Sequence, residues 1–347
     1  MSVQQLTGAG SLIGCHLLSI ADLDGDGIAE ILDVAEAFSE IEQRSMRKVP
    51  TLKGKVIASL FFEESTRTRL SFETAAKRLS ADVLSLAVAS SSVKKGESLR
   101  DTIETIESMG IDAVVLRHRS SGAPAQVARW VSTARVINAG DGSHEHPTQA
   151  LIDLFTVRQV LAEDRGVSSE RSGLSLFEGL EVLIVGDIRH SRVARSEILA
   201  YAAAGARVRI AAPGTLLPAS LEGWPVEVVD DLDEAVARAD VISLLRMQEE
   251  RGSGSFVPSL HEFTATYGLT EQRAALAKAT ALITHPGPMV RGVEIASAVA
   301  DRQRTLVRRQ VRNGVPVRMA TLFLALSTTE QPVEIAALGA QLGGDRG

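Results

Sequence analysis

Residues 61–73 of this chain read FFEESTRTRLSFE, and they mark a point where a buried strand turns into a helix. Residues 56–62, VIASLFF, form a nearly unbroken apolar run, which is typical of a strand covered on both faces. After the turn, Phe72, Ala75, Ala76 and Leu79 recur at the spacing of one helical face. The stretch therefore predicts a strand–turn–helix unit of an α/β fold.

The polar residues at this turn predict an anion site. Residues 65–68 should lie at the helix N-terminus, where unpaired N–H groups and the helix dipole attract negative charge. Arg67 and Arg69 add fork-shaped donors that suit phosphate oxygens. A simple N-cap followed by solvated arginines is the alternative, but adjacent hydroxyls on Ser65 and Thr66, with a third on Thr68, exceed what capping requires. The sequence has no G-x-x-x-x-G-K-[ST] motif, so a nucleoside triphosphate is not the expected ligand.

Composition limits the class of protein. A length of 347 residues suggests about two domains, and 45% hydrophobic residues are ample for packed cores. The net charge of −6 disfavours general binding to nucleic acid. Cys15 is the only cysteine, so neither a disulfide within the chain nor a cysteine-based metal site is expected. Residues 11–20 are apolar but too short to span a membrane, and no basic segment precedes them, so we expect a cytoplasmic protein without membrane association.

Apolar runs alternate with helical patterns along the whole chain, which predicts α/β layers on mostly parallel sheets flanked by helices. A polar segment, 163–175, separates two halves, and an apolar helix is expected at about 317–327. Polar residues of interest follow the strands, and ligands bind at the carboxyl ends of strands in open sheets. The expected strands are 56–62, 83–86, 113–116 and 135–138 in the first half, and 180–185, 207–211, 226–229 and 241–245 in the second.

The S-T-R-T-R run of residues 65–69 resembles the carbamoyl-phosphate signature of the aspartate/ornithine carbamoyltransferase family. Six motifs occur in the family's order, so the resemblance covers about residues 16–327. It implies a carbamoyl-phosphate-binding domain at 1–150, an aspartate-binding domain at 151–302, and an active site in the cleft between them. The C-terminal helix, within about 303–347, is expected to pack back on the first domain.

The loop at residues 90–98, SSSVKKGES, is open to two interpretations. From the residues alone, a flexible basic surface loop is as good an explanation as a binding loop. In the family, a similar S-x-x-K-K-G-E loop reaches into a neighbouring subunit's active site. The resemblance therefore implies a homotrimer in which Ser91 and Lys95 contact the phosphate across the interface, with Lys95 also contacting aspartate.

Three further motifs complete the expected carbamoyl-phosphate site. Residues 144–146, HEH, could suggest a metal, but a lone H-x-H in a turn is a weak signal, and no metal is expected. The resemblance instead implies that Arg117 binds both the phosphate and the carbonyl oxygen, and that His146 of the H-P-T-Q motif donates to that oxygen. It assigns Gln149, and the backbone carbonyls around Gly287 and Pro288, to the carbamoyl amide. The remaining implied phosphate ligands are Ser65, Thr66, Arg67 and Thr68.

The second substrate is indicated by residues after two later strands. A strand–Gly unit at 180–187 is superficially similar to a dinucleotide site, but it lacks G-x-G-x-x-G, so a nicotinamide dehydrogenase is disfavoured. The resemblance is to the aspartate branch: Arg192 for one carboxylate, and Arg246 with Gln248, in R-x-Q, for the other. Two arginines facing a dicarboxylate make physical sense. The D-x-x-x-S-M-G element of the ornithine branch is not found at this position. Residues 285–288 read H-P-G-P, which departs from the H-P-L-P-R of many aspartate enzymes.

We therefore predict a transferase of the aspartate branch, which moves the carbamoyl group of carbamoyl phosphate to the amine of L-aspartate in pyrimidine biosynthesis. Thr68, Arg117 and His146 are the expected catalytic residues, and no cofactor is expected. The alternatives are an ornithine or other amino-acid carbamoyltransferase, and a non-catalytic scaffold for another pyrimidine enzyme. Binding of a regulatory chain or of dihydroorotase is left open.

Overall fold

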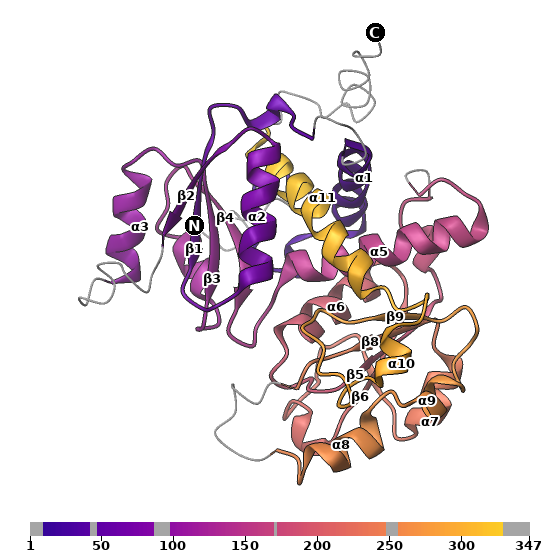
Figure 1. Ribbon diagram of the computed structural model, residues 1–347. Helices are drawn as coiled ribbons and strands as arrows, with labels where there is room; N and C mark the ends of the chain where they lie inside the picture. The colour runs from indigo at the N-terminus through magenta and orange to yellow at the C-terminus, as the bar shows by residue number, and fades with distance from the viewer. Residues whose placement is uncertain (1–9, 42–46, 87–97, 170–171, 248–255, 329–347) are drawn as a thin grey trace.

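The computed structural model describes residues 10–41, 47–86, 98–169, 172–247 and 256–328. These residues form two sheets, and every strand pair in them is parallel. Helices flank both sheets, so the predicted α/β architecture is confirmed (Figure 1). The first sheet has the order β2-β1-β3-β4, from β1 (Val56–Phe61), β2 (Asp82–Leu86), β3 (Ala113–His118) and β4 (Arg135–Asp141). The second has the order β7-β6-β5-β8-β9, from β5 (Glu181–Val185), β6 (Arg207–Ala211), β7 (Glu227–Val228), β8 (Val241–Leu244) and β9 (Leu282–Thr284).

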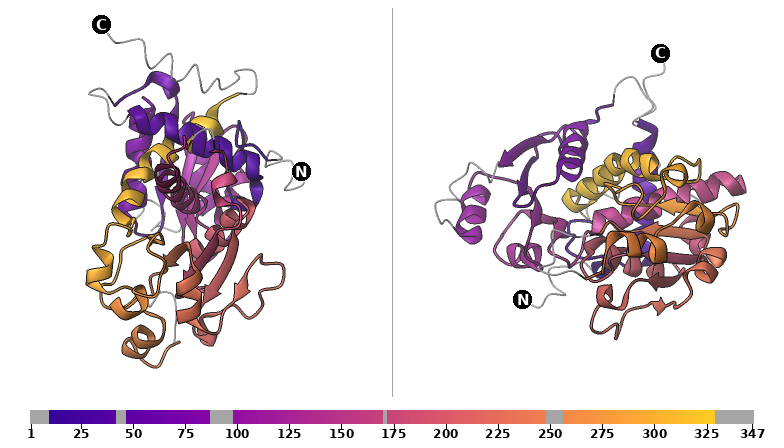
Figure 2. Two further views of the ribbon diagram at one scale, coloured as in Figure 1. Left: turned by 90° about the vertical axis from the view of Figure 1, so that its right-hand side faces the viewer. Right: turned by 60° about the horizontal axis from the view of Figure 1, so that its bottom comes forward.

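The helices cover the two sheets and connect them (Figures 1 and 2). In the first half they are α1 (Gly25–Ile41), α2 (Thr66–Arg78), α3 (Leu99–Glu107), α4 (Ala123–Ala128) and α5 (Pro147–Arg165). In the second half they are α6 (Arg192–Ala203), α7 (Leu232–Arg238), α8 (Leu260–Tyr267), α9 (Glu271–Ala274), α10 (Ser297–Ala300) and α11 (Val307–Leu326). None of the described helices is both long and apolar enough to cross a lipid bilayer.

Strand β1 shows why an apolar run becomes the centre of a sheet. Successive side chains of a strand point to opposite faces. Ile57 packs into a buried cluster with Phe72 of α2, whereas Ala58 and Leu60 pack into a second cluster with Ile103 of α3. Both faces of β1 are thus buried, as is usual for the central strands of parallel sheets.

Helix α11 begins ten residues before the expected helix at 317–327. Arginines interrupt the apolar pattern in its first turns, and one of them, Arg309, faces α5 and pairs with Glu163. The helix then runs between α1 and α2 and contacts both, as Figure 1 shows in yellow. The first turns of α11 therefore lie near the junction between the two sheets, a position that the sequence did not indicate.

Candidate active site

Both sheets have their topological switch point at the same cleft. Strand order reverses between β1 and β3 in the first sheet, and between β5 and β8 in the second. Ligands of open α/β sheets bind in the crevice at the carboxyl ends of such strand pairs. Arg67 lies at the start of α2, which follows β1, and Arg246 lies in the turn after β8; both arginines line one cavity. The two halves of the chain thus build a single site.

The N-terminus of α2 supplies the neutral donors of this site. Ser65 is the N-cap residue, and its side chain makes no capping hydrogen bond. Its hydroxyl is therefore not used to stabilise the helix, which fits a ligand role better than a capping role. Thr68 is 7% exposed and lies in the first turn, where no acidic side chain occurs. An anion placed here would meet helix N–H groups and hydroxyls without a competing carboxylate on the first turn.

The guanidinium of Arg67 lies against the loop that follows β9. Gly287 has φ +66°, and a Cβ built on it would stand 2.3 Å from Nη1 of Arg67. Glycine adopts this positive φ without strain, and its lack of a side chain lets the guanidinium lie this close to the backbone. Burial and the neighbouring Arg246 lower the pKa of Arg67, because a desolvated cation beside another cation is less favourable. An incoming anion would offset both effects, because an opposite charge favours the charged form of the guanidinium.

His285 stays uncharged beside these arginines. Its Nδ1 accepts a hydrogen bond from the Gly287 N–H at 2.7 Å, which shapes the loop. Burial, together with Arg67 and Arg246, lowers the pKa of His285 to about 3. The imidazole is consequently neutral near pH 7, and the positive charge of this wall of the cleft comes from guanidinium groups.

Arg117 and Arg192 converge from the two sheets onto one carboxylate. Nη2 of Arg117 donates to Oε1 of Glu63 at 2.9 Å, and Nη2 of Arg192 donates to Oε1 and Oε2 at 2.9 and 2.7 Å. Gly140 makes room for them, because a Cβ there would stand 2.9 Å from Nη1 of Arg192 and 3.1 Å from Nη1 of Arg117. Arg192 is 3% exposed and opens α6, where Ser191 is the N-cap.

His146 and Gln149 lie at the start of α5. His146 is the N-cap residue and Pro147 is the first helical residue, a position that proline favours. The His146 backbone N–H donates to Oγ of Ser196 on α6 at 2.9 Å, which joins the turn to the second sheet's helices. Gln149 lies half-buried one turn into the helix, and its Nε2 donates to Oδ1 of Asp153 at 2.9 Å.

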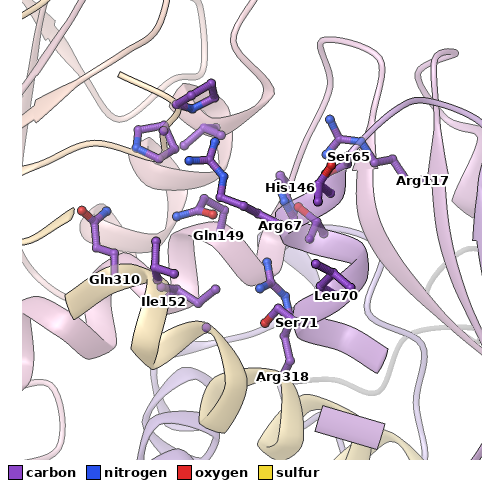
Figure 3. A pocket seen from close by; sticks show the side chains of 18 of the residues that line it. Ser65, Arg67, Leu70, Ser71, Arg117, His146, Gln149, Ile152, Gln310 and Arg318 are labelled. Carbon is purple, nitrogen blue, oxygen red and sulfur yellow. The ribbon is translucent and has the colours of Figure 1, made fainter. Parts of the chain in front are cut away.

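The cavity has a volume of about 770 Å³, and Figure 3 shows Ser65, Arg67, Arg117, His146 and Gln149 around it. Ser91, Lys95 and Gln248 lie outside the described residues, so the structure does not place them. Arg69 does not line the cavity; its Nε lies 3.9 Å from Oε1 of Glu73, on the same helix. The expected site residues that line the cavity together are Ser65, Thr66, Arg67, Thr68, Arg117, His146, Gln149, Arg192, Arg246, Gly287 and Pro288.

Several residues near the cleft were not predicted, among them Gln310, Arg318 and Glu63. Gln310 and Arg318 line the cavity from α11, and they share one helix face with Gly314, four residues from each. That spacing could have been recognised if the helix had been expected to begin at 307. Burial and Arg117 lower the pKa of Arg318 to about 9. Glu63 lies within the opening stretch, but nothing in its local pattern indicated that it would meet arginines from both sheets.

The fold and the site define a class of protein. Among the residues that the structure describes, five arginines line the cavity, and the neutral donors at the start of α2 face the same space. This arrangement is that of a two-domain α/β protein that gathers small, multiply charged anions between its domains.

Comparison with known proteins identifies the family. The protein-family model described as aspartate/ornithine carbamoyltransferase, carbamoyl-P binding domain, matches residues 15–159 of this chain. The model of the Asp/Orn binding domain matches residues 178–325. The chain therefore belongs to the aspartate/ornithine carbamoyltransferase family.

Relatives and solved structures agree with this assignment. The aspartate carbamoyltransferase catalytic subunit of Parafrankia sp. is 53% identical over 311 residues, which cover 90% of this chain and 96% of the relative. That of Corynebacterium aurimucosum is 52% identical, over 91% of this chain and 98% of the relative. The catalytic subunit of M. jannaschii aspartate transcarbamoylase aligns with a TM-score of 0.74 at 35% identity, covering 91% of this chain and 99% of that one. The Trypanosoma cruzi enzyme in complex with N-(phosphonacetyl)-L-aspartic acid aligns with a TM-score of 0.76 at 28% identity, covering 93% and 98%.

Proposed function

We propose that this protein is an aspartate carbamoyltransferase, which transfers the carbamoyl group of carbamoyl phosphate to the amine of L-aspartate and releases phosphate. The observation that carries the proposal is one cavity lined both by Arg67 at the α2 N-terminus and by Arg192 and Arg246 beyond the second sheet. The first group suits a phosphate, and the other two suit a dicarboxylate. The names of the relatives, each an aspartate carbamoyltransferase catalytic subunit, support the same reaction.

The proposed reaction begins with the phosphate held by the start of α2. Helix N–H groups, the hydroxyls of Ser65, Thr66 and Thr68, and the guanidinium of Arg67 neutralise its charge. Binding also makes phosphate a better leaving group, because its developing negative charge is already stabilised.

The carbonyl group of carbamoyl phosphate is then attacked by the amine of aspartate. Arg117, His146 and Thr68 stabilise the charge that develops on the carbonyl oxygen, and Gln149 with the backbone carbonyls of Gly287 and Pro288 holds the carbamoyl amide. The C–N bond forms as the C–O bond to phosphate breaks, and the departing phosphate takes the amine proton. Alignment of two bound reactants lowers such barriers by about 7–11 kcal/mol when the geometry is good.

The proposal extends to aspartate binding and to assembly. Arg192 and Arg246, with Gln248, bind the two carboxylates, and Ser91 with Lys95 completes the phosphate site from a neighbouring subunit of a cytoplasmic homotrimer. The proposed domains are 1–150 and 151–302, with the C-terminal helix returning to the first. The contacts of α11 with α1 and α2 support that return, while α5 crosses the boundary between the proposed domains.

A panel of amine acceptors tests the proposed function. Purified protein is given carbamoyl phosphate with L-aspartate, L-ornithine or another amino acid, and carbamoylated products are quantified. L-aspartate should be the preferred acceptor because two arginines complement its two carboxylates. Faster carbamoylation of ornithine would assign the chain to the other branch of the family.

A further inference from the structure

A pair of carboxyl groups lies completely buried beside the proposed site. Asp153 of α5 and Glu197 of α6 are each 0% exposed. Charged groups buried without compensation are strongly unfavourable, so such a pair requires partners or a proton. Neither residue lines the cavity, and the reaction proposed above uses neither of them.

Asp153 accepts hydrogen bonds from two side chains that do line the cavity. Its Oδ1 receives the Nε2 of Gln149 at 2.9 Å and the Nε2 of Gln310 at 2.7 Å. Gln310 in turn accepts the backbone N–H of His285 at 3.1 Å through its Oε1. A single carboxylate oxygen thus fixes the amide of Gln149 directly, and it reaches the start of the loop 285–288 through one further side chain. Gln149 and Gln310 approach this side of the cavity from α5 and α11 (Figure 3).

Two buried carboxyls in contact disfavour double ionisation, and the surroundings of the pair favour a proton on Glu197. Burial and the adjacent Asp153 raise the pKa of Glu197, and both of its oxygens receive the hydroxyl of Ser243 at 2.9 Å. Oδ2 of Asp153 is buried and receives no donor from the described residues when both carboxyls are ionised. A proton on Glu197 supplies that donor and leaves Asp153 as the acceptor for the two glutamines.

We propose that Asp153 is a positioning residue that makes this end of the pocket selective for an NH2 group. By taking the Nε2 of Gln149, it leaves the Oε1 of Gln149, to which no described residue donates, as the amide atom available to a ligand. Through Gln310 it also steadies the loop whose carbonyls would accept from the same NH2. This inference rests on the proposed function, because a carbamoyl amide is the NH2 group to be recognised.

A pair of stable ligands measures this selectivity without turnover. Phosphonoacetamide and acetonylphosphonate share the phosphonate and the carbonyl and differ only in NH2 against CH3. Isothermal titration calorimetry gives the dissociation constant of each. The native protein should prefer the amide, and Asp153→Ala should reduce that preference about tenfold, the size expected from one misdirected buried hydrogen bond. Affinity for the methyl ketone should change by less than about twofold, because its phosphonate contacts are unaltered.

Two further variants separate positioning from general damage. Thr156 is another buried polar residue between α5 and α11, and its Oγ1 accepts a hydrogen bond from Nδ2 of Asn313 at 3.0 Å. Thr156→Val removes this group and should leave the preference for the amide ligand unchanged. In a Gln149→Ala background, Asp153→Ala should alter the preference much less than it does in the native protein, since its main route to the ligand is gone. If Asp153→Ala does not fold, Asp153→Leu fills the space and equally lacks an acceptor.

The outcomes are distinct. Equal weakening of both ligands by Asp153→Ala, or an unchanged preference, would overturn the positioning role while leaving the proposed function intact. A native protein that binds neither phosphonate would instead remove the proposed function itself.

Discussion

Glu63 and Arg192 join the two halves of the molecule through one guanidinium nitrogen. Nη2 of Arg192, at the start of α6, donates to both carboxylate oxygens of Glu63, in the turn between β1 and α2, at 2.9 and 2.7 Å. Arg117 shares the same carboxylate at 2.9 Å. The side chain of Arg192 is 3% exposed and that of Glu63 is 26% exposed, so the bridge lies largely out of water.

We predict that Glu63→Gln lowers the free energy of unfolding by about 1.5–3 kcal/mol, the range for hydrogen bonds to charged groups. The reason is that a buried guanidinium loses its countercharge. Glu104→Gln is the matched control, since its pair with Arg100 is equally short at 2.7 Å but exposed, and it should cost less than about 1 kcal/mol. Denaturant unfolding measures the loss of free energy of unfolding in each variant. Equal losses would show that the buried Glu63 bridge stabilises the fold no more than an exposed ion pair does.

Arg67→Ala should lower kcat about 100- to 1000-fold, the usual effect of removing one donor that stabilises developing charge. Its side chain lies in the cavity at the surface of α2, so the fold should persist, as circular dichroism and the unfolding midpoint can show. Arg69→Ala, two residues along and outside the cavity, should retain activity within about threefold of the native value. Similar losses in the two variants would contradict the assignment of Arg67 to the phosphate.

Arg246→Ala should raise the KM for aspartate about 10- to 100-fold, which corresponds to one lost charge-assisted hydrogen bond pair. The KM for carbamoyl phosphate should change much less, because the start of α2 remains. Steady-state kinetics with each substrate varied in turn separates the two values. Equal increases would place Arg246 in the phosphate site instead.

His16 makes the fold sensitive to acid. Its Nδ1 accepts the backbone N–H of Val136 at 2.9 Å, and burial with nearby Arg135 lowers its pKa to about 4. As the pH falls below 6.5, His16 is therefore protonated in the unfolded chain but not in the folded one. Its full contribution to the free energy of unfolding is present above pH 6.5 and is lost as the pH drops towards 4.

His16→Asn keeps an acceptor for Val136 but cannot be protonated in this range. As the pH falls from 6.5 to 4, the free energy of unfolding of the variant should rise relative to that of the native protein by about 1.4 kcal/mol per pH unit. Unfolding free energies measured across this range test the sign. A difference independent of pH would show that His16 titrates normally in the folded protein.

Mixing inactive variants tests the shared site. If Lys95 acts on a neighbouring subunit, the combination of Lys95→Ala and Arg67→Ala chains should restore some activity, because some hybrid sites then contain both native residues. The hybrids are formed by reversible dissociation and assayed against each variant alone. No recovery in demonstrably mixed trimers would place Lys95 in its own subunit's site.

The sequence predicted those parts of the molecule that depend on local pattern. The start of α2 was recognisable because a buried strand, hydroxyls and a helical stripe are contiguous at 56–79. The eight expected strands all form, although residues 226–229 shorten to Glu227–Val228 on an exposed edge.

Features that depend on long-range contact were missed. Strand β9, at Leu282–Thr284, is too short to give a periodic signal. The early turns of α11 interrupt the apolar pattern with residues such as Arg309, which forms an ion pair with Glu163 of α5. The pairing of Glu63 with Arg192 joins residues 129 positions apart, and no local spacing reports such a contact. The sequence thus predicted residues that line one cavity, but not the carboxylates that contact some of them; the ligand roles stay predictions.

A crystal structure with N-(phosphonacetyl)-L-aspartate tests the central claim most directly, because this compound carries the phosphonate and the dicarboxylate in one molecule. The phosphonate should lie within hydrogen-bond distance of Ser65 to Thr68, including the guanidinium of Arg67. The two carboxylates of the compound should contact Arg192 and Arg246. A compound bound through only one of these groups, with the other group in solvent or in a separate cavity, would contradict the account.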